Sequence, residues 1–242
     1  MRQSSTEFKT LLLKAGMGAD LPLGLSEDLI RPSVWLQACG LEGDVEALYT
    51  LHCLDRGISV RGFPELSSQG TISAVVEKRV SAAYLGAQIS DALQLGWPNN
   101  SSEIVFPSID SPKIVAAAMV LAHRDLSLDF SIQAVAGELM FCSFESGKEV
   151  LVRQHANDGG LHGSRGSDLV IRAKGAIADT THGDILVDGE SEAHLMRHCR
   201  EKGLNATTEV IRDLQSLASR LLVPETEQSL RFGAGAGIIA TD

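Results

Sequence analysis

The first 95 residues of the chain show a helical pattern of apolar and polar positions. Residues 6–15 and 44–54 are each predicted to form a helix, and glycines follow both segments. Gly16 and Gly18 are expected to end the first of these helices. Residues 81–95 are apolar or small almost throughout, which predicts a buried helix. We therefore expect residues 1–95 to form a helical segment.

A further helix is expected between Ser26 and Gly40. Apolar residues fall near one of its faces: Leu25, Leu29, Trp35 and Leu36. Ser26 is predicted to be the N-cap, because acidic residues follow it in the first turn, where they favour the positive end of the helix dipole. Gly40 is expected to end the helix. Pro32 lies inside the pattern and predicts either a kink or a later start.

The pattern changes to a period of two between residues 103 and 187. Apolar residues alternate with polar ones from Leu126 to Gln133, which predicts a strand with one solvent-exposed face. Residues 113–122 are predicted to be a more buried partner strand, joined to it by the polar link 123–125. An apolar run of this length could equally be a buried helix.

Two further features support a sheet in this middle stretch. Residues 145–147 separate the segments 138–144 and 148–153, which predicts a second hairpin, and residues 168–174 alternate again. Successive strands without helices between them indicate an antiparallel sheet.

The last stretch returns to helical spacing. Residues 190–202 are predicted to be a helix that ends at Gly203, and Asn205 or Thr207 is expected to cap the next one. That helix carries an apolar stripe at helical spacing: Val210, Ile211, Leu214, Leu217, Ala218 and Leu221. A glycine–alanine repeat then occupies residues 233–237.

Together these patterns predict an α+β fold. A central antiparallel sheet over residues 103–187 is expected to be covered by helices from the N-terminal segment, residues 1–95, and from the C-terminal segment, residues 190–242. The chain of 242 residues suits a single domain, 1–242, that ends in a glycine-rich tail.

Charge and composition narrow the function. The net charge of −10 and the absence of a Lys/Arg cluster disfavour nucleic acid and anionic membranes as partners. The N-terminus lacks the apolar core of a signal peptide, and residues 114–122 are too short to span a bilayer, which predicts a cytoplasmic protein. The cysteines form no Cys-x-x-Cys pair and are expected to be reduced, buried thiols: Cys39, Cys53, Cys142 and Cys199.

The loop of residues 155–168 is the best candidate ligand site by composition. It contains His155, Asp158 and His162 together with serines, an arginine and four glycines, between two predicted strands. Loops on a rigid sheet often carry function, and histidines bind metals or transfer protons. The alternative is a mobile polar loop, which the absence of a known metal-ligand spacing favours.

Two other histidine arrangements are incomplete. His194 and His198 lie four residues apart on one predicted helix, which is the spacing of a zinc pair, but Leu195 replaces the glutamate of the metalloprotease pattern. With no third ligand at a recognisable spacing, we predict no metal. His182 and Asp184 form only half of a catalytic triad, since no nucleophile is placed by the sequence.

The glycine–alanine repeat is a weak candidate for a nucleotide loop, because no strand–loop–helix frame surrounds it. The backbone at Gly233, Gly235 and Gly237 could approach a ligand or a neighbouring subunit closely. We expect this tail to be ordered near a pocket or a subunit contact. The alternative is a loosely packed terminus. No sequence motif for a phosphate or dinucleotide cofactor is present, so no cofactor is expected.

Three segments carry a resemblance to a known family. They are Leu-Gly-Leu-Ser-Glu-Asp at residues 23–28 with Arg31 following, Gly-Ala-Gln-Ile-Ser-Asp at residues 86–91, and Val-Pro-Glu-Thr-Glu at residues 223–227 with the glycine–alanine repeat beyond. In this order they resemble a bacterial family known as a domain of unknown function. The resemblance implies no activity, cofactor or catalytic residue.

The sequence favours a small-molecule-binding or accessory protein of bacterial metabolism that works as a homo-oligomer. The alternative is an enzyme with a pocket beneath the loop of residues 155–168. The absence of a complete catalytic motif favours the first hypothesis.

Overall fold

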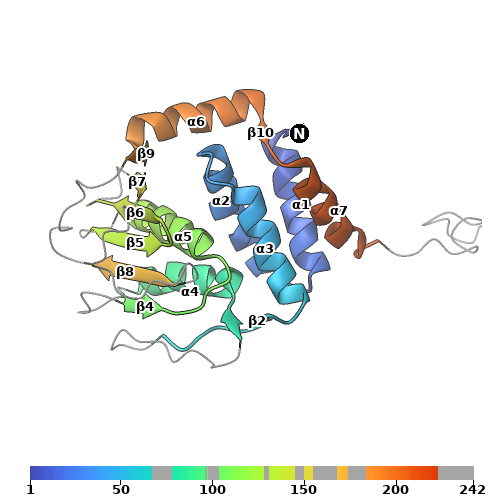
Figure 1. Ribbon diagram of the computed structural model, residues 1–242, viewed down its shortest axis with the longest axis horizontal. Coiled ribbons are helices and arrows are strands. Elements are labelled where there is room, and N and C mark those ends of the chain that lie inside the picture. Colours follow the sequence, from blue (N-terminus) through green and yellow to red (C-terminus); the bar gives the residue numbers. More distant parts are fainter. Residues whose placement is uncertain are drawn as a thin grey trace, which may run out of the picture.

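The computed structural model describes residues 1–66, 78–95, 97, 104–127, 131–144, 150–154, 168–173 and 184–222. Figure 1 shows the arrangement of its helices and strands. The described helices are α1 (Ser5–Gly18), α2 (Leu23–Ala38), α3 (Gly43–Asp55), α4 (Ala82–Gln94), α5 (Pro112–Leu126), α6 (Gly189–Lys202) and α7 (Thr208–Ser219). The longer strands are β4 (Ile104–Phe106), β5 (Ile132–Ala136), β6 (Leu139–Ser143), β7 (Val150–Gln154), β8 (Leu169–Ala173) and β9 (Ile185–Val187). Four two-residue strands are β1 (Arg2–Gln3), β2 (Ser59–Val60), β3 (Arg79–Val80) and β10 (Leu204–Asn205).

Helix α1 begins with a capping box. The Ser4 hydroxyl accepts a hydrogen bond from the Glu7 N–H at 3.1 Å, and the Glu7 carboxylate accepts one from the Ser4 N–H at 2.9 Å. The helix continues through Gly16 and ends at Gly18, the second of the two glycines expected to end it. Helix α7 crosses α1 so closely at this point that only glycine fits at position 18, where a methyl group would collide with the Leu217 carbonyl oxygen.

Helix α2 corrects two expectations. It begins at Leu23, and Ser26 lies inside its first turn, with its hydroxyl donating to the Leu21 carbonyl oxygen at 3.3 Å. Pro32 neither ends the helix nor delays its start, since α2 runs through it to Ala38. Gly40 then has a φ of +74°, the left-handed conformation that favours glycine just beyond a helix end.

The predicted strand at residues 113–122 is instead part of helix α5. Pro112 occupies the first turn, where its missing N–H costs nothing, and a run of alanines follows it. The segment reads as uniformly apolar because the helix lies between the sheet and α4, so that nearly all of its faces are buried. Ser127, with a φ of +49°, ends the helix where the alternating strand was expected to begin.

Within the described residues, six strands form one antiparallel sheet in the order β4-β8-β5-β6-β7-β9. The predicted second hairpin is confirmed as β6–β7, and the predicted strand at 168–174 as β8. Strands β5 and β6 are joined by a two-residue turn, in which Gly137 has a φ of +60°. That sign suits the first central position of a type II′ turn.

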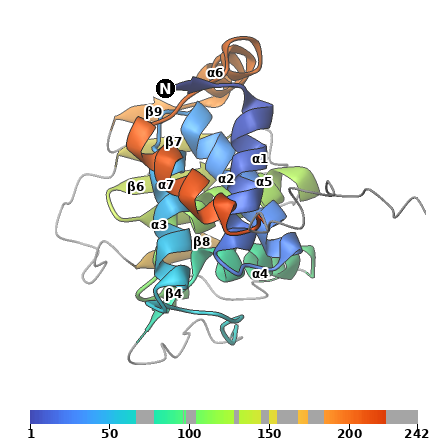
Figure 2. The same cartoon turned by 90° about the vertical axis from the view of Figure 1, so that its right-hand side faces the viewer.

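The fold is α+β, with helices packed on the sheet as the sequence predicts. Helix α5 packs directly on β5 and β6, α4 lies beside α5, and α2 contacts both. Helix α7 lies against α1 and α3 on the side of the helical layer remote from the sheet (Figures 1 and 2). The expected solvent-exposed face of β5 is wrong, because Gln133 is buried beside a second apolar cluster on the other face of the sheet.

The C-terminal helices match the prediction closely. Helix α6 ends at Gly203, and the stripe of α7 is buried up to Leu217, although Leu221 beyond it is exposed. Glu192 anchors α6 to the body, since its carboxylate accepts hydrogen bonds from the Trp35 indole at 2.6 Å and the Arg124 guanidinium at 2.7 Å. No helix among the described residues is long and apolar enough to cross a membrane.

Replacing Gly18 with alanine is expected to lower the free energy of unfolding by about 2 kcal/mol or more, because the new methyl group would push α7 away from α1. Gly24 provides the matched control. It lies in the first turn of α2 with no atom of the described residues within 4 Å of an added methyl group. There alanine should raise stability by about 0.5–1 kcal/mol through helix propensity. Urea denaturation measures both changes, and equal effects would contradict the close α1–α7 contact.

Candidate functional site

The residues that the sequence favoured as a ligand site lie outside the described residues. These are His155, Asp158 and His162 of the loop, and Gly233, Gly235 and Gly237 of the tail. Their roles therefore stay predictions. Of the two incomplete histidine arrangements, His194 and His198 are described and exposed on α6. Among the described residues, no three His, Cys, Asp or Glu side chains are grouped so that they could hold a metal ion.

The four cysteines are buried and none forms a disulfide. Burial raises the pKa of the Cys39 thiol to about 12 and that of the Cys142 thiol to about 11. Since the thiolate is the nucleophile, thiols with these pKa values are unreactive at neutral pH. The expectation of buried thiols is confirmed, and they are poor candidates for chemistry.

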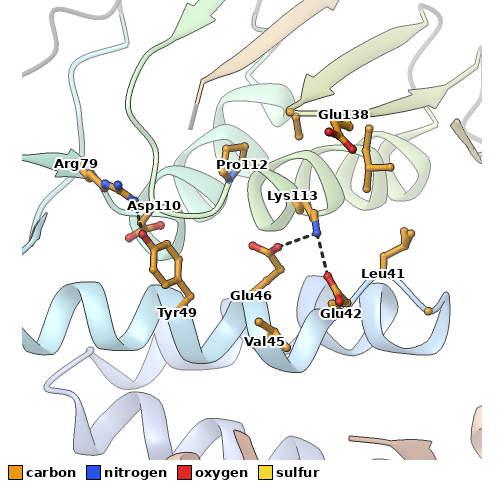
Figure 3. Close-up of a pocket in the computed structure, with 14 residues that line it drawn as sticks. Leu41, Glu42, Val45, Glu46, Tyr49, Arg79, Asp110, Pro112, Lys113 and Glu138 are labelled. Atoms are coloured by element: carbon orange, nitrogen blue, oxygen red, sulfur yellow. Dashed lines mark hydrogen bonds and ion pairs between the residues drawn. The ribbon is translucent and has the colours of Figure 1, made fainter. Parts of the chain in front are cut away.

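A cleft of about 860 Å³ with charged walls lies beside α3, and we call it the α3–α5 cleft. Its walls come from four places: the α2–α3 connection with the exposed face of α3, strand β3, the segment that leads into α5, and the β5–β6 turn (Figure 3). The side chains that matter for its chemistry are Glu42, Val45, Glu46, Tyr49, Arg79, Asp110, Lys113 and Glu138.

Helix α3 contributes one continuous face to this cleft. Glu42, Val45, Glu46 and Tyr49 follow at intervals of i, i+3, i+4 and i+7, so that their side chains line the same side of the helix. This polar and aromatic stripe on an otherwise buried helix is visible in the sequence, but it belongs to no known motif. These four positions form a second face of α3, opposite the apolar face.

A pair of opposite charges crosses the middle of the cleft. The Lys113 ammonium lies 2.9 Å from a carboxylate oxygen of Glu46 and 3.6 Å from one of Glu42. The Ser111 hydroxyl donates to the other carboxylate oxygen of Glu46 at 2.6 Å. Glu46 is therefore held from two sides at the start of α5, where a negative charge is favoured by the helix dipole.

Arg79 and Tyr49 form one end of the cleft. The Arg79 guanidinium donates a hydrogen bond to the Tyr49 hydroxyl, and its carbon lies 5.8 Å from the centre of the Tyr49 ring. Burial raises the pKa of the Tyr49 phenol, as does the neighbouring Cys53. The phenol therefore stays neutral at physiological pH and keeps a hydroxyl that both donates and accepts hydrogen bonds.

Asp110 lies at the floor of the cleft and is almost completely buried. Its carboxylate accepts hydrogen bonds from the N–H groups of Ala82 at 2.8 Å and of Ser111 at 2.7 Å, and from the Ser59 hydroxyl at 2.8 Å. The Thr50 hydroxyl lies at 3.5 Å. Burial outweighs these hydrogen bonds and raises the pKa of Asp110 to about 6. Because two backbone N–H groups and a serine hydroxyl already donate to its oxygens, Asp110 holds these segments together and is not a free acid or base.

A smaller cavity of about 360 Å³ lies between α2, α4 and α5. It brings together two of the segments that carry the family resemblance, 23–28 and 86–91, through Glu27, Asp28 and Asp91. Burial raises the pKa of the Asp28 carboxyl, and the charges of Asp91 and Glu27 raise it further. Arg31 of the same motif is engaged by Asp125 in a bidentate ion pair, which spans this cavity.

Substituting Asp110 tests the raised pKa and the structural role of its buried carboxyl group. Between the unfolded pKa of 3.8 and the folded pKa of about 6, the folded protein holds a proton that the unfolded chain has lost. This contribution to stability is complete below about pH 4 and is lost as the pH rises to about 6. Asp110→Asn removes it. The asparagine oxygen keeps the bonds from the Ala82 and Ser111 N–H groups, and its NH2 group donates to the Ser59 oxygen in place of the bond that the carboxylate accepts. Its stability relative to wild type should therefore rise by up to about 3 kcal/mol from pH 4 to pH 7.

Asp110→Ala is the companion variant. It leaves two buried N–H groups without an acceptor and should cost about 2–4 kcal/mol at pH 4. Because this variant also lacks the titrating carboxyl group, the cost relative to wild type should fall by up to about 3 kcal/mol between pH 4 and pH 7, as for Asp110→Asn. Chemical denaturation at pH 4 and pH 7 measures both variants. If the difference between wild type and Asp110→Asn does not change with pH, the carboxyl group has an ordinary pKa.

Comparisons with models of protein families and with curated proteins give no match. Among solved structures, the chain is similar to a protein from E. coli that is described as a candidate malate/lactate dehydrogenase. The identity is 8%, the TM-score is 0.49, and the match covers 96% of this chain and 98% of the other. A likeness at this level leaves fold and function to be argued from the residues of the chain itself.

Proposed function

We propose that this chain is a small-molecule-binding protein of bacterial metabolism and that its ligand occupies the α3–α5 cleft. The observation that carries the proposal is the size of the cleft together with its walls. A volume of about 860 Å³ lies within the range of pockets for small molecules. Side chains of both charges converge on it from four separate parts of the fold, which is the arrangement that orients a polar ligand.

The chemistry of the cleft supports binding rather than catalysis. Glu46 and Lys113 neutralise each other, and Asp110 is occupied by structural hydrogen bonds. Tyr49 has a raised pKa, so its phenol stays protonated at neutral pH and does not act as a general base. Within the part of the chain that the structure describes, the cleft therefore offers fixed charges and hydrogen-bonding groups without an activated nucleophile.

The remaining expectations belong to the same proposal. We propose a cytoplasmic protein, which fits four buried thiols without a disulfide, and a homo-oligomer as the working form. Membership of the bacterial family that the sequence resembles is supported by the packing of two of its segments around one cavity, between α2 and α4.

A blocking substitution tests the site. Val45 lies on the exposed face of α3 that lines the cleft, so Val45→Trp should fill the cleft without disturbing the core. Leu23→Trp is the matched control, because Leu23 is exposed at the start of α2 and outside the cleft. A thermal-shift screen would use amino acids, carboxylic acids, amines, nucleosides and sugar phosphates as probes.

At least one class of compound should raise the melting temperature of the wild type and of Leu23→Trp, since a ligand that binds the folded state stabilises it. The same compound should have no effect on Val45→Trp. Stabilisation that persists in Val45→Trp would place the ligand elsewhere. A screen in which no compound stabilises the wild type would refute the proposed function.

A further inference from the structure

The two ends of the α3–α5 cleft differ in charge. Arg79 and Tyr49 stand at one end, and Glu42 and Glu138 at the other, with Lys113 between these two glutamates (Figure 3). A ligand that satisfies both ends must carry a negative group and a positive group at separate positions. The distribution of charge in the cleft therefore restricts the class of ligand more closely than the volume of the cleft does.

The Arg79 end is suited to a carboxylate. No carboxylate of the described residues lies within 4.0 Å of the Arg79 guanidinium, whose side-chain partner is the neutral Tyr49 hydroxyl. Asp110 is nearby on the floor but accepts its hydrogen bonds from Ser59, Ala82 and Ser111. A guanidinium binds a carboxylate through two parallel N–H···O bonds, which makes this pairing strong and directional.

The opposite end is suited to a cation. Glu42 is the N-cap residue of α3 and its side chain is 69% exposed, while Glu138 is exposed in the β5–β6 turn. The Lys113 ammonium contacts Glu42 and Glu46, and Glu138 lines the same cleft, so three carboxylates face one ammonium and two negative charges are uncompensated. A protonated amine at this end of the cleft would neutralise part of this excess and donate up to three hydrogen bonds.

The geometry of α3 sets the separation of the two ends. Glu42 and Tyr49 are seven residues apart on one helical face, which corresponds to about 10 Å along the axis. The reach of the side chains and the lengths of the ionic hydrogen bonds shorten the span that the ligand must cover. An α-amino acid, with both charges on neighbouring atoms, is too short, whereas a chain of about six carbon atoms spans the gap.

We propose that the α3–α5 cleft binds an ω-amino carboxylate, with its carboxylate on Arg79 and its protonated amine at the end of the cleft that Glu42 and Glu138 line. This inference rests on the proposed function, because it names the ligand class of the same cleft. The Lys113–Glu46 pair contributes no net charge to the cleft. The recognition is therefore two-ended, and both ligand charges are needed.

The first test compares three probes of equal length on the wild-type protein: 6-aminohexanoate, hexanoate and hexylamine. Isothermal titration calorimetry should give the tightest binding for 6-aminohexanoate. Each of the other two should bind about tenfold or more weakly, because each lacks one charge-assisted contact. 4-Aminobutanoate should also bind more weakly than 6-aminohexanoate. Hexanoate or hexylamine binding as tightly as 6-aminohexanoate would overturn the inference.

The second test assigns each charge to its end of the cleft. Arg79→Gln should remove the preference for 6-aminohexanoate over hexylamine, and the double variant Glu42→Gln/Glu138→Gln should remove the preference over hexanoate. Arg56→Gln and Glu201→Gln are matched controls, since both residues are exposed outside the cleft. A partly unfolded variant would bind all three probes more weakly by one factor, so a change in the ratios is specific. Unchanged ratios in correctly folded variants would overturn the assignment.

The two proposals fail in different ways. If another compound stabilises the wild type but not Val45→Trp, while 6-aminohexanoate has no effect, the cleft is a binding site with a different ligand class. If no compound shows an effect that depends on Val45, the proposed function fails as well.

Discussion

The carboxylate of Asp110 joins four segments that are far apart along the chain. It accepts hydrogen bonds from the start of α4, from the start of α5 and from β2, and the Thr50 hydroxyl of α3 lies beside it. Val80 and Ile109 form a parallel bridge next to it, so α4 and α5 begin side by side. Both helices thus direct the positive ends of their dipoles at one buried carboxylate. Burying the Asp110 carboxylate would otherwise be costly, but it is tolerated because hydrogen-bond donors surround the charge.

The position of the α3–α5 cleft depends on the segments that Asp110 holds together. Because α5 begins at Pro112 with its first turn held against α3, Lys113 faces Glu46 and Glu42 across the gap. The β5–β6 turn closes the other side, since α5 packs on those two strands. The walls of the cleft are an exposed face of α3, strand β3, the start of α5 and a turn, where side chains project into solvent without disturbing the core. This is why charged residues gather there while α5 itself is apolar.

Much of the fold could be predicted from local pattern. The turn residues 145–147 between two strand segments predicted the β6–β7 hairpin, and the alternation of residues 168–174 predicted β8. The apolar stripe of α7 predicted the face that is buried up to Leu217. The errors share one cause, which is that packing overrides local signals. Ser26 is a good N-cap in isolation, but α2 begins earlier, at Leu23, and residues 112–126 form a helix between the sheet and α4. The candidate site escaped prediction because Glu42, Arg79 and Glu138 belong to three segments that no motif connects.

The sequence by itself determined the class of the fold, because the repeat of apolar residues, about 3.6 in a helix and two in a strand, can be recognised within each segment alone. It also determined the acidic surface and the absence of a known catalytic motif. The tertiary structure alone decided that residues 112–126 form a helix, since a segment buried on nearly every side loses its periodicity. It alone decided which charges meet in the α3–α5 cleft, because their separation depends on how three elements pack and not on any spacing along the chain.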